Sequence, residues 1–595
     1  MCGIAGILRR GDEPVLPAEL EPMVAFLRRR GPDHAGYWTR GGAGVGHARL
    51  AIIDLSAAGN QPMVRRDGTL VVTHNGEIYN HLELRRELEA EGSAFASVSD
   101  TEVLLEGYLR WGIDGLLSRI DGMYAFGLLD LAGGRAHLCR DPLGKKPLYY
   151  ASEDGTFRFA SDIRSVASGL GSLDPDPESL DYYLTELSVP QPGSIWKGIR
   201  QVRPGHRLTL DLATHERTES PHWVLPRREV RRVGLEEAES LVEECLTRAI
   251  VKRTVADVPV GAFLSGGTDS GLVVALLASR GGAPLRTFTI GFTEEDFTEI
   301  PYARALARRY ATQHEEILVR PDVAQLLPEI VAGMGEPFAD PGAVTQFVVC
   351  REACRHVKVA LSGDGGDELF GYPGYARTWR ADTKAARLRR RLLGDRRGGR
   401  RLLRGMGFTR EQRLALYSGD MIAHTGFAEG RLDEIWRRND AGSLTGTLFR
   451  ASLETRLLND YLVKVDRASM MNSMEIRSPF LDRDLVPLAL DLPDEHKFRD
   501  GRAKYLLRRL AQKHVDPSIL GRRKRGFGLP LAGWLRGELK EMMQDLLSAE
   551  CVRRRGLFRP DAVGRLVAEH LEDRRDHKHR LWALMCLELW LRSRG

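Results

Sequence analysis

Two globular units of different fold class are predicted by this 595-residue sequence: an α+β unit, then an α/β unit with a parallel sheet and a helical C-terminal part. The chain is several times longer than a typical single domain, so one hydrophobic core is not expected. Short strand-like runs fill its first part, whereas helical patterns alternate with short apolar runs further on. We expect the first unit at residues 1–210, a linker at 211–234 and the second unit at 235–595.

Strands separated by Gly, Asp and Asn turns dominate the first unit. The predicted strands include Gly3–Leu8, Leu70–Thr73, Met123–Leu129 and Phe157–Ala160. Two segments with apolar residues three and four positions apart, Leu82–Glu91 and Thr101–Trp111, are predicted to be helices. The segment that follows residue 210 is polar, charged and without a clear period, as is typical of a linker.

Helices and β-branched apolar runs alternate in the second unit, which predicts a parallel sheet covered by helices. The expected elements are a helix at 236–253, a strand at 258–264, a helix at 270–280, a strand at 285–292, a helix at 301–310 and a strand at 357–361. Beyond about residue 375 almost the whole chain is predicted to be helical.

Composition favours a globular protein of a reducing compartment. Hydrophobic residues make up 43% and charged residues 28%, and no apolar stretch approaches the roughly 20 residues of a membrane-spanning helix. No basic segment followed by an apolar core opens the chain, so no signal peptide is expected. The seven cysteines are scattered and odd in number, which argues against a disulfide framework and favours a cytoplasmic location. Cys350 and Cys354 lack partners at zinc-site spacing and are expected to be ordinary thiols.

An arginine-rich run is the one strong local charge. Nine arginines lie between Arg387 and Arg404, although the net charge of the chain is only +6. Such a run can bind nucleic acid. No aromatic residues accompany it for base stacking, so a solvated helix and loop is the favoured interpretation and a nucleic-acid partner is not expected.

Cys2 is a candidate nucleophile. Removal of Met1 would leave this cysteine with a free α-amino group, whose pKa of about 8 suits it to accept the thiol proton. A cysteine at the second position carries little weight alone. Five segments in order strengthen it: Cys2–Gly6, Arg30–Asp33, His47–Leu50, Asn75–Asn80 and Ser99–Glu102.

Together these segments resemble the N-terminal-nucleophile glutaminase domain of glutamine-hydrolysing asparagine synthetases. The resemblance implies an αββα sandwich and an oxyanion hole formed by Asn75 and Gly76. It places Arg49 on the α-carboxylate of glutamine, and Glu77 with Asp100 on the α-ammonium. A hairpin turn with no catalytic role remains the alternative for the Asn-Gly pair.

A glycine-rich loop, Ser265–Ser270, is predicted to bind phosphate because it joins an apolar strand to a helix. It lacks the Gly-Lys-Ser/Thr of a Walker loop and resembles the Ser-Gly-Gly-x-Asp-Ser pyrophosphate loop of adenylate-forming enzymes. We expect ATP to be opened between its α- and β-phosphates there. The residues assigned to ATP are Leu264, Ser265, Gly266, Gly267, Asp269 and Ser270 and, as the resemblance implies, Ile290, Ser362 and Gly363.

A second acidic loop, Ser362–Glu368, follows another predicted strand. Asp269 and Asp367 would hold Mg²⁺ against the leaving pyrophosphate, because hard cations prefer oxygen ligands. The resemblance implies that Ile290 lies beside the adenine and that Asp364 is the carboxylate near the attacking ammonia. Many family members have Glu in place of Asp364.

Three further segments match the family downstream: Asp460–Ser469, Glu475–Asp482 and Arg523–Gly528. A cation must stabilise the α-phosphate of the adenylate, and Lys464 and Arg467 are the two candidates. Their spacing does not choose between them.

Departures from the family pattern concern the phosphate loop and the acceptor. Thr268 stands where Leu or Val is commoner, and Gly271 where a second Ser would add a hydroxyl near the phosphates. The segment Glu336–Thr345 lacks the arginine that follows the acidic turn in the better-known aspartate-using enzymes. Retention of Cys2 argues against a β-lactam-forming relative.

Amidation of aspartate to asparagine, with ammonia travelling inside the protein from Cys2, is therefore the favoured hypothesis. The alternatives are amidation of another carboxylic acid by the same steps, and a nucleic-acid-binding protein on an inactive scaffold. Glutamine, ATP and a carboxylic acid are the expected small-molecule partners. No membrane partner is expected, and a homodimer is left open.

Overall fold

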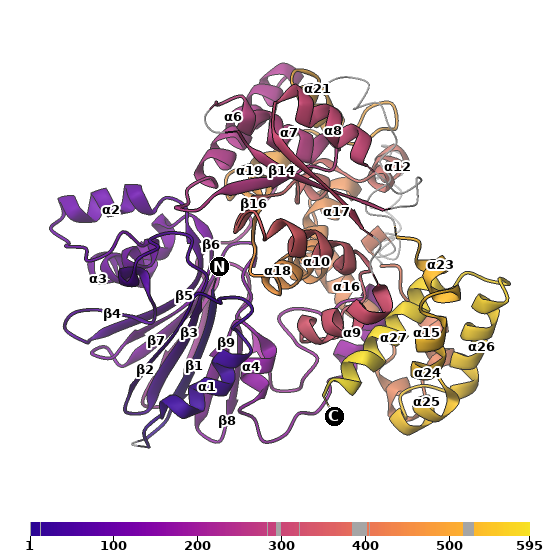
Figure 1. Cartoon of the computed structure of the whole chain (residues 1–595), viewed down its shortest axis with the longest axis horizontal. Helices are drawn as coiled ribbons and strands as arrows, with labels where there is room; N and C mark the ends of the chain where they lie inside the picture. The colour runs from indigo at the N-terminus through magenta and orange to yellow at the C-terminus, as the bar shows by residue number, and fades with distance from the viewer. Residues whose placement is uncertain are drawn as a thin grey trace.

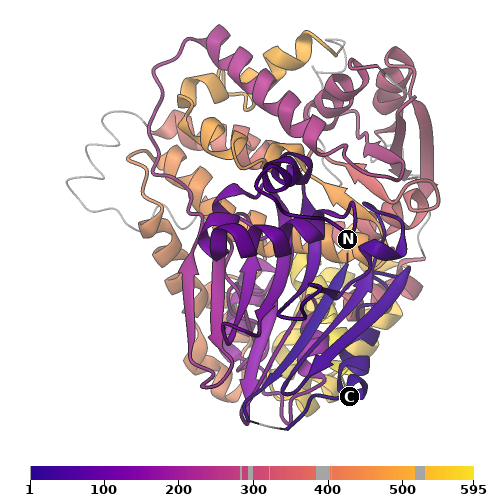
Figure 2. The ribbon, with the colours of Figure 1, turned by 90° about the vertical axis from the view of Figure 1, so that its left-hand side faces the viewer.

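The computed structural model describes residues 2–11, 13–281, 284–292, 299–319, 322–382, 402–403, 405–515 and 529–594. The arginine run up to residue 401, Arg404 and the segment Arg523–Gly528 lie outside these residues. Figure 1 shows the chain running from a β-rich half to a helix-rich half, and Figure 2 shows the strands of the first half from the side. No helix among the described residues is both long and apolar enough to cross a bilayer.

Two antiparallel six-stranded sheets form the first half. The first sheet has the order β10 (Arg200–Gln201), β8 (Tyr149–Glu153), β9 (Thr156–Ala160), β1 (Gly3–Arg9), β3 (Ala43–Arg49) and β2 (His34–Arg40). The second has the order β12 (Arg217–Pro221), β11 (His206–Asp211), β7 (Arg135–Arg140), β6 (Gly122–Asp130), β5 (Leu70–Ile78) and β4 (Met63–Val64). Apolar side chains from both, among them Ile4, Val45, Val71 and Leu129, form one buried layer between them.

Helices cover the outer faces, which confirms the predicted α+β class. The helices of this half are α1 (Pro17–Ala25), α2 (His81–Ala90), α3 (Asp100–Arg119), α4 (Ile163–Ala167) and α5 (Pro177–Glu186). Leu88 and Leu104 of α2 and α3 pack on Val72 and Leu128 of the second sheet, whereas α1 packs on β1 and β3 and α4 on β9 and β8. The expected linker start at residue 211 is wrong, because β12 pairs with β11 and extends the sheet to Pro221. Its polar composition reflects an edge strand exposed on both faces.

A five-stranded parallel sheet lies at the centre of the second half. Its order is β15 (Gln313–Val319), β14 (Arg286–Phe292), β13 (Val260–Phe263), β16 (Val359–Leu361) and β17 (Glu475–Arg477). The strand β17 lies in the part of the chain predicted to be almost wholly helical. It is a strand because it pairs along β16, a contact between distant segments that periodicity does not reveal. The chain order reverses beside β13, and ligands of such sheets bind at the carboxyl ends of the strands at that point.

Helices surround this sheet and form the rest of the second half. Those near the sheet are α6 (Leu235–Lys252), α7 (Thr268–Ala278), α8 (Ile300–Arg309), α9 (Val323–Met334), α10 (Gly342–Ala353), α11 (Gly366–Phe370), α12 (Pro373–Ala381) and α18 (Leu462–Met470). The others include α15 (Arg410–Leu416), α16 (Phe427–Arg438), α17 (Leu444–Ser452), α19 (Leu485–Asp491), α20 (Asp494–Lys497), α21 (Tyr505–Gln512), α23 (Leu531–Arg536), α24 (Lys540–Leu546), α25 (Ala549–Arg555), α26 (Pro560–Leu571) and α27 (Lys578–Arg592).

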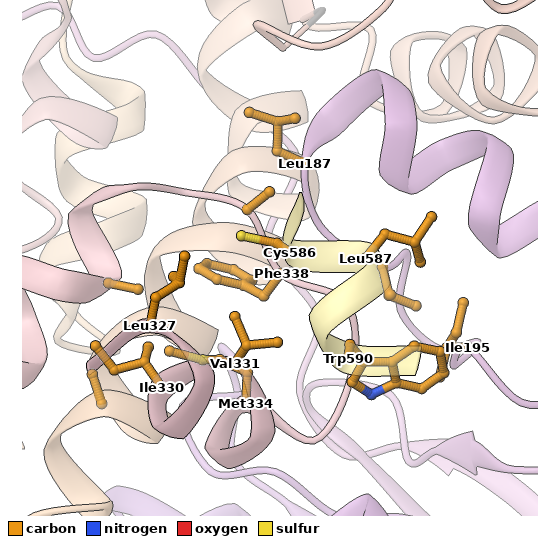
Figure 3. Close-up of a cluster of buried hydrophobic side chains, with 14 of the residues drawn as sticks. Leu187, Ile195, Leu327, Ile330, Val331, Met334, Phe338, Cys586, Leu587 and Trp590 are labelled. Carbon is orange, nitrogen blue, oxygen red and sulfur yellow. The ribbon is translucent and has the colours of Figure 1, made fainter. Parts of the chain in front are cut away.

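One hydrophobic core crosses from the first half into the second. Figure 3 shows Ile195 of the first half beside Trp590 of α27, and Leu187 of the first half in the same cluster as Val331 and Met334 of α9. The Trp590 indole also donates to the Gly335 carbonyl oxygen at 3.0 Å. The two halves therefore share buried apolar surface, which fixes their sites relative to one another.

Candidate active sites

The Cys2 site lies at the start of β1, where the strand is held between β3 and β9. The backbone nitrogen of Cys2 donates to Asn75 Oδ1 at 3.2 Å, and Asn75 Nδ2 donates to Ser161 Oγ at 3.3 Å. Arg30 Nε donates to the Cys2 carbonyl oxygen at 3.2 Å. Burial raises the pKa of the Cys2 thiol, so an adjacent proton acceptor is needed to form the thiolate.

Glycine is required at position 76 by its surroundings. Its φ of +150° is one that other residues rarely adopt, and a Cβ atom there would overlap the carbonyl oxygen of Met123 on the paired strand β6. The neighbouring Asn75 is fully buried. The pair lies within the long strand β5, so the hairpin-turn alternative is wrong: both residues pair with β6.

Three charged side chains predicted to bind glutamine are buried in this half. Arg49 donates to Asn60 Oδ1 at 2.7 Å and to backbone carbonyl oxygens, including that of Ser56 at 2.9 Å. Asp100 Oδ2 accepts from the Ile78 nitrogen at 2.8 Å. Glu77 Oε2 is buried without a hydrogen bond among the described residues. Burial, together with the carboxylates of Glu475 and Asp100, raises the pKa of Glu77 well above its usual range.

The glycine-rich loop joins β13 to α7, as predicted. Gly267 is the N-cap of α7 and provides no side-chain cap, so the helix start is available to an anion. Inside the loop, Ser270 Oγ accepts from the Ser265 nitrogen at 3.2 Å. Gly266 has a φ of +67°, and a Cβ there would lie 2.6 Å from Tyr302 Cβ.

Gly271 does not create the predicted gap near the phosphates. A Cβ at this position would point at Leu306 Cδ1, 3.1 Å away, and at Val515 Cγ2, 3.7 Å away. A serine hydroxyl there would meet apolar side chains of α8 and the segment after α21. The expectation of a missing phosphate ligand at Gly271 is therefore wrong.

The two acidic loops meet at the carboxyl ends of β13 and β16. Gly363 and Gly366 permit the approach, because Cβ atoms there would lie 2.9 Å from the Ser270 nitrogen and 2.7 Å from Asp269 Cγ. Asp269 and Asp367 thus face the same space, as the sequence predicted.

Lys504 is the cation between these carboxylates. Its Nζ lies 2.5 Å from Asp269 Oδ2 and 2.8 Å from Asp367 Oδ1. Lys504 was not predicted, because no motif in the sequence contains it. One local feature could have indicated it. Lys504 is the N-cap residue of α21, where the helix dipole disfavours a positive charge unless an anion is near.

The remaining predicted nucleotide residues lie around the same strand ends. Ser362 Oγ donates to Asp364 Oδ2 at 2.7 Å and lies 3.2 Å from Ser478 Oγ. Ile290 is buried on β14, which pairs with β13. Leu264 directly follows β13, and its nitrogen donates to the Phe288 carbonyl oxygen at 2.8 Å.

Lys464 and Arg467 lie elsewhere on α18. Lys464 forms an ion pair with Asp340. Arg467 donates to the Met334 carbonyl oxygen at 2.6 Å and to the Tyr149 hydroxyl at 2.7 Å. Their contacts among the described residues do not reach the Ser265–Ser270 loop, whereas those of Lys504 do.

Polar contacts connect the Cys2 site to the second half. Arg30, which donates to the Cys2 carbonyl, forms a bidentate ion pair with Asp466 of α18. Its Nη1 lies 2.8 Å from Asp466 Oδ2 and its Nη2 lies 3.1 Å from Oδ1. Glu77 Oε2 lies 3.7 Å from Arg477 Nη2 on β17. Residues far apart in the sequence thus join the two candidate sites.

The fold and these sites define a glutamine-dependent ligase, in which an N-terminal glutaminase half is joined to an amide-forming half. Residues 1–223 match a family model described as a glutamine amidotransferase domain, and residues 241–592 match one described as asparagine synthase. The chain belongs to the asparagine synthase family.

Relatives align over nearly the whole length. Asparagine synthetase (glutamine-hydrolysing) 1 of Bacillus subtilis is 31% identical over 625 residues, covering 99% of this chain and 96% of that protein. A putative asparagine synthetase of Mycobacterium tuberculosis is 35% identical over 647 residues, covering 99% and 97%. The amidase chyE of Penicillium rubens is 28% identical over 611 residues, covering 90% and 88%.

Proposed function

We propose that the protein is a glutamine-hydrolysing asparagine synthetase, which transfers the amide nitrogen of glutamine to the side-chain carboxylate of aspartate and uses ATP to activate that carboxylate. One observation carries the proposal: a single chain joins a buried thiol beside an amide and a glycine to two carboxylates that converge on one ammonium group. The family match over both halves supports this pairing.

In the first half we assign the nucleophile to Cys2, freed of Met1. Its α-amine accepts the thiol proton, Sγ attacks the amide carbon of glutamine, and the proton leaves with ammonia. The Asn75 amide and the Gly76 N–H donate to the oxyanion. Water then hydrolyses the thioester to glutamate. Arg49 binds the α-carboxylate of glutamine, and Glu77 with Asp100 binds its ammonium, which would give Glu77 Oε2 the hydrogen bond that it lacks among the described residues.

In the second half a carboxylate oxygen of aspartate attacks the α-phosphorus of ATP, and pyrophosphate leaves. Ammonia then attacks the acyl carbon, so that AMP departs and asparagine forms. Lys504 is our assignment for the cation that donates to the α-phosphate where negative charge accumulates. Asp364 accepts the proton that the attacking ammonia loses. We assign the phosphates to both loops and the adenine to the neighbourhood of Ile290.

Mg²⁺ fits the pair Asp269 and Asp367. An ammonium group already bridges the two carboxylates, so their oxygens converge on a space that suits one cation. When bound, the metal would neutralise charge on the departing pyrophosphate. Entry of the metal would free Lys504 to reach the phosphates.

The direct test gives purified protein glutamine, ATP, Mg²⁺ and aspartate. We expect asparagine, glutamate, AMP and pyrophosphate in equal amounts. Omission of Mg²⁺ should stop formation of AMP but leave hydrolysis of glutamine. Formation of ADP in place of AMP would contradict the proposed activation step.

A different acceptor is the second candidate, because Glu336–Thr345 has no arginine to bind a second carboxylate. Hydrolysis of glutamine without formation of asparagine, in protein that makes AMP from ATP with another acid, would favour this second candidate.

We also propose that the linker between the two units is the segment 222–234, between β12 and α6.

A further inference from the structure

We propose that Lys464, Asp340 and Asp460 form the subsite that recognises the amino-acid end of the acceptor, so that the acceptor is an α-amino dicarboxylic acid. Lys464 binds the α-carboxylate, and the two aspartates bind the α-ammonium. The inference rests on the proposed function and names the residues that select its substrate.

The three side chains come together from two segments. Asp340 precedes α10. Its Oδ1 accepts a hydrogen bond from the Gly342 nitrogen at 2.9 Å, and its Oδ2 forms an ion pair with Lys464 Nζ. Asp460 lies four residues before Lys464 in continuous helical backbone, so both lie on one helix face. Figure 1 shows α10 and α18 side by side below β16.

The cluster has capacity for a ligand. Asp460 Oδ1 is buried and makes no hydrogen bond among the described residues. The side chains of Asp340 and Lys464 are still 20% and 12% exposed, so a small solute can reach them. A Cβ on Gly342 would lie 3.3 Å from Lys464 Nζ, so a larger residue would crowd the space beside the ammonium.

The charges complement a zwitterion. Burial and the Asp340 carboxylate raise the pKa of Asp460 well above its usual range, whereas the Lys464 ammonium lowers that of Asp340. The two carboxyl groups therefore compete for the single Lys464 ammonium, and a second bound cation would favour the ionised form of both. The α-ammonium of a bound acceptor would pair with the two aspartates in place of Lys464. Lys464 would then pair with the α-carboxylate of the same acceptor.

Contacts link this cluster to the proposed metal carboxylates. The Lys464 ammonium lies 4.4 Å from the Tyr461 ring centre, and the Tyr461 and Tyr372 rings pack against the same hydrophobic core. The Tyr372 hydroxyl in turn donates to Glu368, which follows Asp367. An acceptor held by its amino-acid end at Lys464 can thus extend its other carboxylate toward the ATP loops.

This arrangement supplies the positive charge that Glu336–Thr345 lacks. No arginine occurs in that segment, yet Lys464 reaches it from α18. A lysine from another helix would therefore replace an arginine of the segment itself.

The test compares three acids in the presence of added ammonium: aspartate, succinate, which lacks the ammonium group, and 3-aminopropanoate, which lacks the α-carboxylate. Formation of AMP is measured for wild-type protein and for Lys464→Met, Lys464→Arg and Asp460→Asn. The matched control is Lys540→Met, at an exposed lysine of α24. Hydrolysis of glutamine by each variant reports on folding.

Wild-type protein should prefer aspartate to both analogues by about 100-fold or more in kcat/KM. Lys464→Met should lose the preference over 3-aminopropanoate, mainly through a higher KM for aspartate, and Lys464→Arg should recover part of it. Asp460→Asn should lose the preference over succinate.

An unchanged preference for aspartate over 3-aminopropanoate in Lys464→Met would overturn the inference. So would wild-type protein that uses either analogue as well as aspartate, and in both cases the proposed function would stand. Wild-type protein that makes no AMP with aspartate would instead reject the proposed function, and the inference with it.

Discussion

The two candidate sites differ in how their buried polar and charged groups are paired. Around Cys2, neighbouring strands provide fixed hydrogen bonds, and the proposed nucleophile and the proposed oxyanion donors all lie within the chain. At the ATP loops, two carboxylates face each other and the protein's own Lys504 holds the space between them. The hydrogen bonds of the first site are therefore formed without substrate, whereas on the proposed function the two carboxylates of the second site would still need a metal and a nucleotide.

Loss of the Cys2 thiol should have the largest effect, because it should abolish the use of glutamine and leave the use of ammonium. Cys2→Ala should lower glutamine-dependent asparagine formation by about 1000-fold or more, because no other group can form the thioester. Activity with added ammonium should remain. Cys354→Ala, at a half-buried cysteine far along the chain, is the control and should keep both activities. Glutamine-dependent turnover surviving in Cys2→Ala would refute the nucleophile assignment.

Neutralising one of the two proposed metal ligands, Asp367, tests the site at the ATP loops. Asp367→Asn should lower the formation of AMP and pyrophosphate by about 100-fold or more, since a neutral amide is a poor Mg²⁺ ligand. Hydrolysis of glutamine should persist, measured as glutamate release without ATP. Loss of both reactions together would indicate misfolding and not a site-specific role.

Removal of Lys504 tests whether its ammonium group occupies the proposed metal position between Asp269 and Asp367. Lys504→Met should lower AMP formation by roughly 100-fold through loss of phosphate stabilisation. It should also increase the rise in melting temperature caused by Mg²⁺ alone, because Asp269 and Asp367 are left facing each other without a cation. An equal Mg²⁺ effect in both proteins would show that Lys504 does not occupy the metal position.

Acid should weaken the first half through its buried histidines. His47 is fully buried, and burial lowers its pKa from about 6.5 to about 3. Below pH 6.5 His47 binds a proton in the unfolded chain but stays neutral in the folded protein. The free energy of unfolding is therefore unaffected by His47 above pH 6.5 and decreases as pH falls toward 3. Between pH 7.5 and 5.0 the cost is about 2 kcal/mol.

The measurement is urea denaturation of His47→Gln and wild-type protein at these two pH values. The variant should lose about 2 kcal/mol less on acidification. His424→Gln, at a partly buried histidine of the second half, is the control. Identical acid sensitivity of His47→Gln and wild type would show that His47 is not held neutral.

Local motifs, and the family resemblance that they carry, predicted much of each candidate site. Cys2, Asn75 and Gly76 belong to contiguous motifs, and both acidic loops follow strands with a clear apolar pattern, so the order of the chain placed them. Lys464 and Arg467 were predicted as candidates for the cation at the α-phosphate and Lys504 was not, because a local pattern does not distinguish between basic residues in helical segments. Which of them reaches the phosphate loop depends on how distant helices pack.

Thus the sequence by itself determined the two fold classes, the thiol site and the glycine-rich loops, since these depend on short-range periodicity and on residues adjacent in the chain. The tertiary structure decided that β12 completes the second sheet, that β17 extends the parallel one and that Lys504 joins Asp269 to Asp367. Strand pairing and the meeting of charges depend on contacts between remote segments, which hydrophobic burial brings together and no local pattern encodes.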